Sequence, residues 1–178
     1  MGTVIDFDGQ PSREGVLEMR RQLRQLEIDR DMEIYRVLVD STDDEILRLL
    51  AEKKEEDPIT IADALGMRSE DLNGLLSEIL PIVMSHTTLI QDQYLRFLEL
   101  LRERARTVED IGTYKFDNDL PIHDPTKEDS HTFELIRKHP KQESLIRSLF
   151  PILYTYFRRR QERAYRDNGE GGEQGREY

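Results

Sequence analysis

The sequence contains no cysteine and no tryptophan, and no apolar run in it approaches the roughly 18 residues that a membrane span needs. Without cysteine there is no disulfide framework, no thiolate metal site and no cysteine nucleophile. The first residues, MGTVIDFDGQPSREG, lack a basic region followed by an apolar one, so we expect no secretory signal. Together these absences predict a cytoplasmic protein that has no membrane partner.

Recognisable motifs of catalysis and nucleotide binding are also missing. The chain has no glycine-rich phosphate loop, no GxSxG and no HExxH. One polar cluster could supply metal ligands, but its spacing matches no closed metal pattern and the segment is typical of a solvated loop: His123, Asp124, Glu128, Asp129 and His131. We therefore expect no enzyme, no cofactor, no metal site and no small-molecule substrate.

Acidic residues are in excess, with 37 Asp and Glu against 26 Lys and Arg and a formal net charge of -11. This balance disfavours a protein that coats nucleic acid without sequence preference. The charge is also unevenly distributed. Residues 37–80 hold twelve acids and four bases, whereas residues 137–166 hold nine bases and two acids. Such asymmetry indicates different roles for different parts of the chain.

The spacing of apolar residues predicts an all-α protein. A helix is expected over residues 15–39, because Val16, Met19, Leu23 and Leu26 recur at intervals of three and four. This helix either packs on its own domain or forms a dimer, so residues 16–39 are a candidate surface for a protein partner or a homodimer. A separate helix is expected over residues 43–54, capped by Ser41 or Thr42.

The second half of the chain also has helical patterns. A long amphipathic helix is expected over residues 85–106 after an interruption or a kink at Pro81, and a short one within residues 125–140. A closing helix over residues 142–166 must kink or restart at Pro151. Weak alternation of apolar residues leaves a small β-hairpin open at residues 113–123.

Residues 58–77, PITIADALGMRSEDLNGLLS, place apolar residues and a glycine as two helices joined by a tight corner would. Gly66 would supply a left-handed turn and Ser69 would cap the second helix. The residues expected to face the interior are Ile61, Ala62, Leu65, Met67, Leu72, Leu75 and Leu76. With the helix before it, this segment resembles the helix-turn-helix, winged or not, of transcription regulators. The resemblance covers about residues 42–80.

The resemblance implies a DNA-binding transcriptional regulator whose second helix reads base edges in the major groove. The candidate base-reading residues are Arg68, Ser69, Glu70, Asn73 and Ser77. Acidic neighbours such as Asp63, Asp71 and Glu78 would oppose the phosphates. The alternative is therefore a non-enzymatic adaptor whose helix-turn-helix docks a protein partner.

The last predicted helix concentrates positive charge. Its candidate phosphate-contacting residues are Arg158, Arg159, Arg160, Arg163 and Arg166, interleaved with Tyr154, Tyr156, Phe157 and Tyr165. Basic residues among aromatic ones suit phosphates and stacked bases. They suit equally well an acidic protein partner or the chain's own acidic segment, and less well a membrane surface.

These patterns divide the chain into four predicted parts. A partly disordered segment spans residues 1–14, and the N-terminal helix with the helix-turn-helix unit spans residues 15–80. A C-terminal helical region with the basic last helix spans residues 81–166. A disordered acidic tail follows at residues 167–178.

Overall fold

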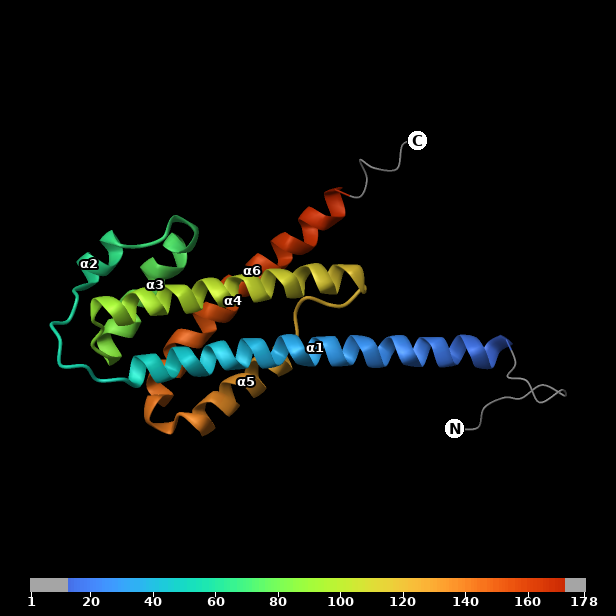
Figure 1. The fold of residues 1–178 in the computed structure, drawn as a ribbon, viewed down its shortest axis with the longest axis horizontal. Helices are drawn as coiled ribbons and strands as arrows, with labels where there is room; N and C mark the ends of the chain where they lie inside the picture. The colour runs from blue at the N-terminus through green and yellow to red at the C-terminus, as the bar shows by residue number, and fades with distance from the viewer. Residues whose placement is uncertain (1–12, 172–178) are drawn as a thin grey trace. The chain divides into compact units, whose positions relative to one another are not determined.

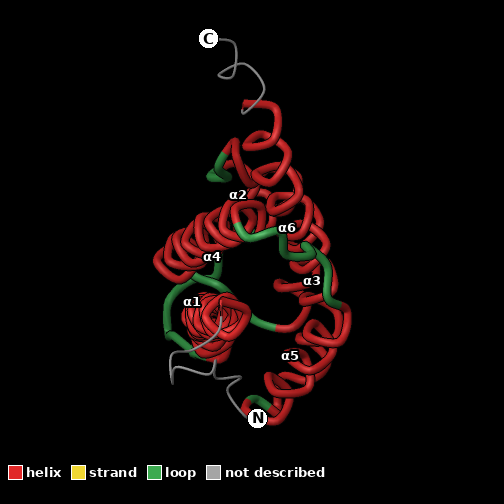
Figure 2. Tube along the Cα trace, turned by 90° about the vertical axis from the view of Figure 1, so that its right-hand side faces the viewer, coloured by secondary structure: helices red, strands yellow, loops and turns green. Residues whose placement is uncertain are grey.

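The computed structural model describes residues 13–171, and its regular structure there is entirely helical (Figures 1 and 2). The α-helices are α1 (Arg13–Ala51), α2 (Ile61–Gly66), α3 (Asn73–His86), α4 (Gln91–Asp117), α5 (Pro125–Lys138) and α6 (Glu143–Gly171). Short 3-10 turns, η1 (Glu70–Leu72) and η2 (Pro140–Gln142), precede α3 and α6. The predicted all-α fold class is therefore confirmed. None of the described helices is long and apolar enough to cross a membrane.

The chain divides between Val37 and Leu38 into two compact units, and α1 runs through this boundary. The four predicted parts of the chain stay a prediction. Most of the N-terminal segment and of the acidic tail, residues 1–12 and 172–178, lies outside the described residues.

Helix α1 is continuous where two helices were predicted, so the boundary expected between residues 39 and 43 is wrong. Thr42, an expected helix cap, lies inside the helix, where its Oγ1 donates to the carbonyl of Leu38 at 2.9 Å. Residues 16–57 contain no glycine or proline, so nothing in the backbone forces a break. A hydroxyl can bond back within a helix as readily as cap a new one.

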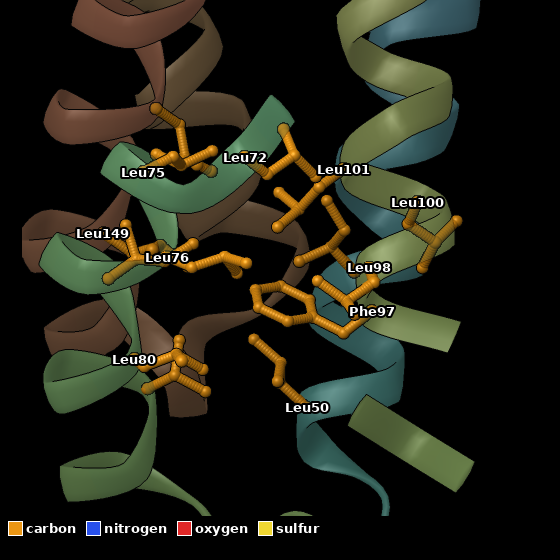
Figure 3. Packing of buried hydrophobic residues seen from close by; sticks show 14 of the residues in the cluster. Leu50, Leu72, Leu75, Leu76, Leu80, Phe97, Leu98, Leu100, Leu101 and Leu149 are labelled. Carbon is orange, nitrogen blue, oxygen red and sulfur yellow. The ribbon is translucent and has the colours of Figure 1, made fainter. Parts of the chain in front are cut away.

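The hydrophobic core of residues 38–171 forms where α1, α3, α4 and α6 meet. Figure 3 shows Leu72, Leu75, Leu76 and Leu80 facing Phe97 and its neighbours across the core. Phe97 is fully buried. The burial of Leu72, Leu75 and Leu76 agrees with the prediction, because each lies on the apolar side of its helix or turn. The same prediction is wrong for Ile61, Ala62 and Met67, which are exposed. Fully burying one such side chain stabilises a fold by about 1.5–3 kcal/mol.

Helix α4 begins later and ends later than the predicted helix at residues 85–106. It incorporates residues 113–117, so the β-hairpin left open at residues 113–123 is wrong. The chain leaves α4 through Asp119, which has a left-handed φ of 54°, and the amide of Leu120 donates to the carbonyl of Lys115 at 2.8 Å. This left-handed helix ending accounts for the polar residues that suggested a hairpin turn.

The two prolines inside predicted helical segments do not end helices. Pro81 lies within α3 and Pro151 within α6, and both are exposed. Of the interruption or kink expected at Pro81, the interruption is therefore wrong, and α6 continues through Pro151 without restarting. The short helix predicted within residues 125–140 is confirmed as α5, whose first turn is capped by the side chain of Asp124.

The corner between α2 and α3 differs from the predicted one. Gly66 is the last residue of α2 and lies outside the left-handed region, and the amide of Met67 donates to the carbonyl of Asp63. Ser69 makes no capping hydrogen bond to the backbone, since its hydroxyl bonds the side chain of Asp71. The roles predicted for Gly66 and Ser69 are therefore wrong, because turn η1 connects the two helices instead.

Candidate functional site

A network of polar side chains lies between α4, α5, α6 and residues 38–51 of α1. It has two ends, which we name after the cation that each contains. The Arg104 end comprises Asp40, Asp43, Arg104, His131 and Phe157. The Lys115 end comprises Lys115, Glu128, Arg158 and Gln161.

At the Arg104 end, a buried ion pair joins α4 to α1. Arg104 donates from Nε to one carboxylate oxygen of Asp43 at 2.6 Å and from Nη2 to the other at 2.9 Å. Asp43 is fully buried and Arg104 is 3% exposed. The guanidinium also lies 4.5 Å from the ring centroid of Phe157 on α6. Paired hydrogen bonds of this kind are strong because both partners are ionised and their shapes match.

His131 on α5 lies between two carboxylates of α1. Its Nε2 is 2.9 Å from Asp43 Oδ2 and its Nδ1 is 3.0 Å from Asp40 Oδ1. Burial alone would lower the pKa of His131, but the hydrogen bonds to Asp40 and Asp43 and their charges raise it to about 9. Both ring nitrogens therefore carry protons at neutral pH.

The pKa of the Asp43 carboxyl group is shifted in the opposite direction. Burial alone would raise the pKa of Asp43, but Arg104 and His131 hold it below its ordinary value. Beside this pair, Tyr154 on α6 bonds Thr132 on α5 through its hydroxyl at 3.1 Å. Burial raises the pKa of Tyr154, so this hydroxyl stays protonated. The charges of the Arg104 end thus balance within the protein.

At the Lys115 end, the cations contact fewer acids. Lys115 Nζ donates to the carbonyl of Ile122 at 2.8 Å and to Gln161 Oε1 at 3.5 Å, and burial lowers its pKa. Arg158 Nη2 lies 3.0 Å from Glu128 Oε2. Arg158 Nε is buried and has no hydrogen-bond partner among the described residues. A buried donor without a partner is costly, so it marks a place where a ligand could bind.

A close contact between backbones holds this end together. A Cβ atom on Gly112 of α4 would lie 2.7 Å from the carbonyl oxygen of Gln161 and 3.0 Å from its Cα. Only glycine therefore permits α4 and α6 to approach this closely. Lys115 follows Gly112 by three residues on the same side of α4, so the contact brings its amine beside the Gln161 side chain.

The arginines predicted to contact phosphates lie on α6 in different settings. Arg158 belongs to the Lys115 end, and Arg160 Nε lies 2.7 Å from Glu109 on α4. Arg166 lies 3.9 Å from Glu162, whereas Arg159 and Arg163 are exposed. Arg158 and Arg160 therefore contact the chain's own acids, one of the alternatives that the sequence leaves open.

The predicted base-reading residues lie around η1 and α3, away from the network. Arg68 precedes η1 and Glu70 is its first residue. Arg68 Nη1 lies 3.5 Å from Ser77 Oγ. Ser77 in turn donates to the carbonyl of Asn73, whose own side-chain oxygen is buried without a partner among the described residues. Nothing in these contacts tests a role in reading bases.

Sequence reasoning missed most of the network, although α4 carries a signal for it. Arg104 and Lys115 fall on the apolar stripe formed by Phe97, Leu101 and Val108. A charge on a buried stripe needs a partner, so it indicates a functional or structural pair. His131 was predicted to lie in a solvated loop. It lies on α5 instead, and its ring packs beside the rings of Phe150 and Tyr154, which corrects that prediction.

A family model described as chorismate mutase type II matches residues 95–162, from the first turns of α4 into α6. No curated protein matches the chain, and no solved structure does. The matched segment contains every cation of the network: Arg104, Lys115, His131 and Arg158.

This match overturns several predictions. It points to an enzyme domain with a small-molecule substrate, chorismate, and so contradicts the regulator, the non-enzymatic adaptor and the DNA partner. The resemblance to a helix-turn-helix was wrong because inward apolar residues and a glycine between short helices occur in many helical corners. The individual base-reading and phosphate-contacting assignments stay untested, but the function for which they were chosen no longer stands.

Proposed function

We propose that this protein is an enzyme that rearranges chorismate to prephenate. One observation carries the proposal: the matched residues 95–162 include the parts of α4 and α6 that hold Lys115 and Arg158, both of which are partly buried. A cation that is partly withdrawn from water loses part of its hydration and needs compensation from its surroundings. The gathering of these two cations between α4 and α6 suits an anionic substrate.

The chemistry of this rearrangement asks for cations and positioning. Chorismate carries two carboxylates, and its rearrangement breaks one carbon–oxygen bond while forming one carbon–carbon bond in the same molecule. No covalent intermediate or cofactor is required, and negative charge grows on the ether oxygen as the bond breaks. Donors and cations fixed around that charge stabilise the transition state more than the bound substrate.

The Lys115 end fits these demands. The described contacts of Lys115 Nζ are with two neutral oxygens, so its charge remains for an anionic group. Arg158 has a buried Nε that a substrate oxygen could accept from. We assign Lys115 to the oxygen that gains charge and Arg158 to a substrate carboxylate. Gln161 positions the lysine from the facing helix.

The test is an assay of the purified full chain with chorismate, following loss of its absorbance and appearance of prephenate. Lys115→Ala and Arg158→Ala should each lower kcat/KM by about 100-fold or more, as removal of a donor to a developing charge does. Arg147→Ala is the matched control, because Arg147 lies on α6 within the matched segment but pairs with Glu143 at the surface. A folded wild-type chain that never converts chorismate would refute the proposal.

The cytoplasmic location expected from the sequence also stays a prediction. Fractionation of cells that produce the full chain, followed by immunodetection in each fraction, would test it.

A further inference from the structure

Helix α1 has an apolar stripe in residues 16–37, within the first compact unit and outside the matched residues 95–162. Successive members of the stripe are three or four residues apart, so they lie along one side of the helix. Its apolar members, interrupted once by Arg30, are Val16, Met19, Leu23, Leu26, Ile34 and Val37. All of these except Val16 are exposed, and Leu26 in the middle is 65% exposed. A continuous apolar strip on a protein surface marks a site of interaction.

The charges on this part of α1 have opposite signs in its two halves. Residues 13–24 hold four bases and two acids, whereas residues 27–33 hold four acids and one base. A second copy of the helix laid antiparallel places each positive half against a negative half, and two-fold symmetry makes both contacts equivalent. The stripe is therefore complementary in charge to itself when the second copy is reversed.

Single side chains beside the stripe repeat this complementarity. Arg20 and Glu27 are seven residues apart, so they border the stripe on the same side. When Leu23 packs against Leu26 of a second copy, Arg20 lies beside Glu27 of that copy. Neither Arg20 nor Glu27 has an ion-pair partner among the described residues, whereas Arg21 pairs with Glu18 within the helix.

The arginine within the stripe decides against a parallel arrangement. In a parallel pair in register, Arg30 of each copy would face Arg30 of the other between apolar side chains, where like charges repel strongly. In the antiparallel pair, Arg30 faces Met19 of the second copy and keeps its contact with Asp31, at 3.1 Å in the single chain.

We propose that residues 16–37 of α1 pair with the same residues of a second copy of this chain, as an antiparallel coiled coil with its two-fold axis between Leu23 and Leu26. The pair buries the apolar stripe and gives Arg20 and Glu27 partners of opposite charge.

The first test is the mass of the purified full chain, measured by sedimentation equilibrium. Leu26→Glu should halve the mass of the assembly, because the pairing places two new charges in the apolar contact. Leu17→Glu is the matched control and should keep the wild-type mass, since Leu17 is also exposed but lies on another side of α1. Both substituted side chains are exposed, so circular dichroism should show the core of residues 38–171 still helical. A monomeric wild type, as expected if the stripe binds a different protein, or an unchanged mass for Leu26→Glu overturns the proposal.

The second test is the orientation of the two helices. Because the chain has no cysteine, each introduced cysteine reports on its own position. Met19→Cys and Arg30→Cys chains, mixed under reducing conditions and then oxidised, should form the mixed disulfide, and neither variant alone should form a disulfide dimer. Disulfide dimers of either variant alone, without the mixed product, overturn the antiparallel arrangement. Neither test uses chorismate, so failure of the pairing and failure of the enzymatic proposal are separate outcomes.

Discussion

The Arg104 end and the Lys115 end each pair a cation of α4 with a second cation from α5 or α6, and these buried or partly buried charges are neutralised differently. At the Arg104 end, the carboxylates of Asp43 and Asp40 on α1 lie at hydrogen-bond distance from the two cations, Arg104 and His131. At the Lys115 end, the amine contacts two neutral oxygens, and Arg158 Nε is buried without a hydrogen-bond partner among the described residues. The first arrangement suits stability, and the second suits the binding of an anion.

The difference has a thermodynamic meaning. A buried pair contributes little net stability when complete, but removing one partner leaves an uncompensated charge that costs several kcal/mol. A cation held by neutral oxygens already bears much of that cost in the folded protein. Substitutions at the Arg104 end should therefore lower stability more than turnover. Substitutions at the Lys115 end should lower turnover more than stability.

The largest loss of stability is expected for Asp43→Ala. The change leaves Arg104 buried without its carboxylate, so the free energy of unfolding should fall by about 3–5 kcal/mol. Urea titration followed by circular dichroism measures this fall. Asp43→Leu combined with Arg104→Met should recover most of it, because an apolar pair leaves no charge to compensate. A loss no greater than that of Asp44→Ala would remove the distinction between the two ends.

His131→Gln should produce a loss that depends on pH. The pKa of His131 is raised to about 9 from an ordinary value of 6.5. Its stabilising effect is therefore complete below about pH 6.5 and disappears as the pH rises through 9. The variant should be less stable than wild type by on the order of 2–3 kcal/mol at pH 6, and by much less at pH 10. Unfolding titrations at both pH values decide, and a constant difference would mean that His131 is neutral in the folded protein.

Gly112→Ala should weaken the contact that holds the Lys115 end. The added methyl would meet the backbone of Gln161 and the Cβ of Ala164, which cannot yield without separating α4 from α6. Overpacking of this kind costs about 1–3 kcal/mol. Thermal unfolding should show the loss, and turnover of chorismate should fall with it. Gly74→Ala is the control, because no atom lies within 4 Å of a Cβ placed there.

The smallest effect on folding is expected for Lys115→Met. It removes a partly buried amine that no carboxylate of the described residues faces at hydrogen-bond distance, so the free energy of unfolding should change by less than about 1 kcal/mol. The same variant should lose nearly all turnover. Denaturant titration and the chorismate assay on one preparation provide both values. A large loss of stability with turnover intact would contradict this assignment, because Lys115 would then serve the fold and not catalysis.

The sequence predicted those parts of the fold that depend on local spacing. The short helix α5 and the inward side of η1 and α3 were predicted, the latter from leucines at helical spacing, whereas the cap at Asp124 was seen only in the structure. It could not separate one long α1 from two helices, because Ser41 and Thr42 are compatible with both a cap and a helix interior. That ambiguity is resolved only by packing of α1 on the core.

The site was less accessible from sequence for a different reason. Arg104 and Asp43 are 61 residues apart, so their pairing depends on how helices assemble. Lys115 belonged to the segment that suggested a hairpin, which concealed its place on the stripe of α4. The arginines of α6 were noticed as a charge cluster, but only Arg158 among them faces the network.

The contact at Gly112 has a consequence for how the enzyme would respond to salt. It fixes the distance between Lys115 and Gln161 by the contact of two backbones, which ions in solution do not screen. The spacing of these two groups should therefore be the same in dilute buffer and in concentrated salt. Any fall in chorismate turnover with rising ionic strength would then report weaker attraction of an anionic substrate, and the geometry of the site would be unchanged.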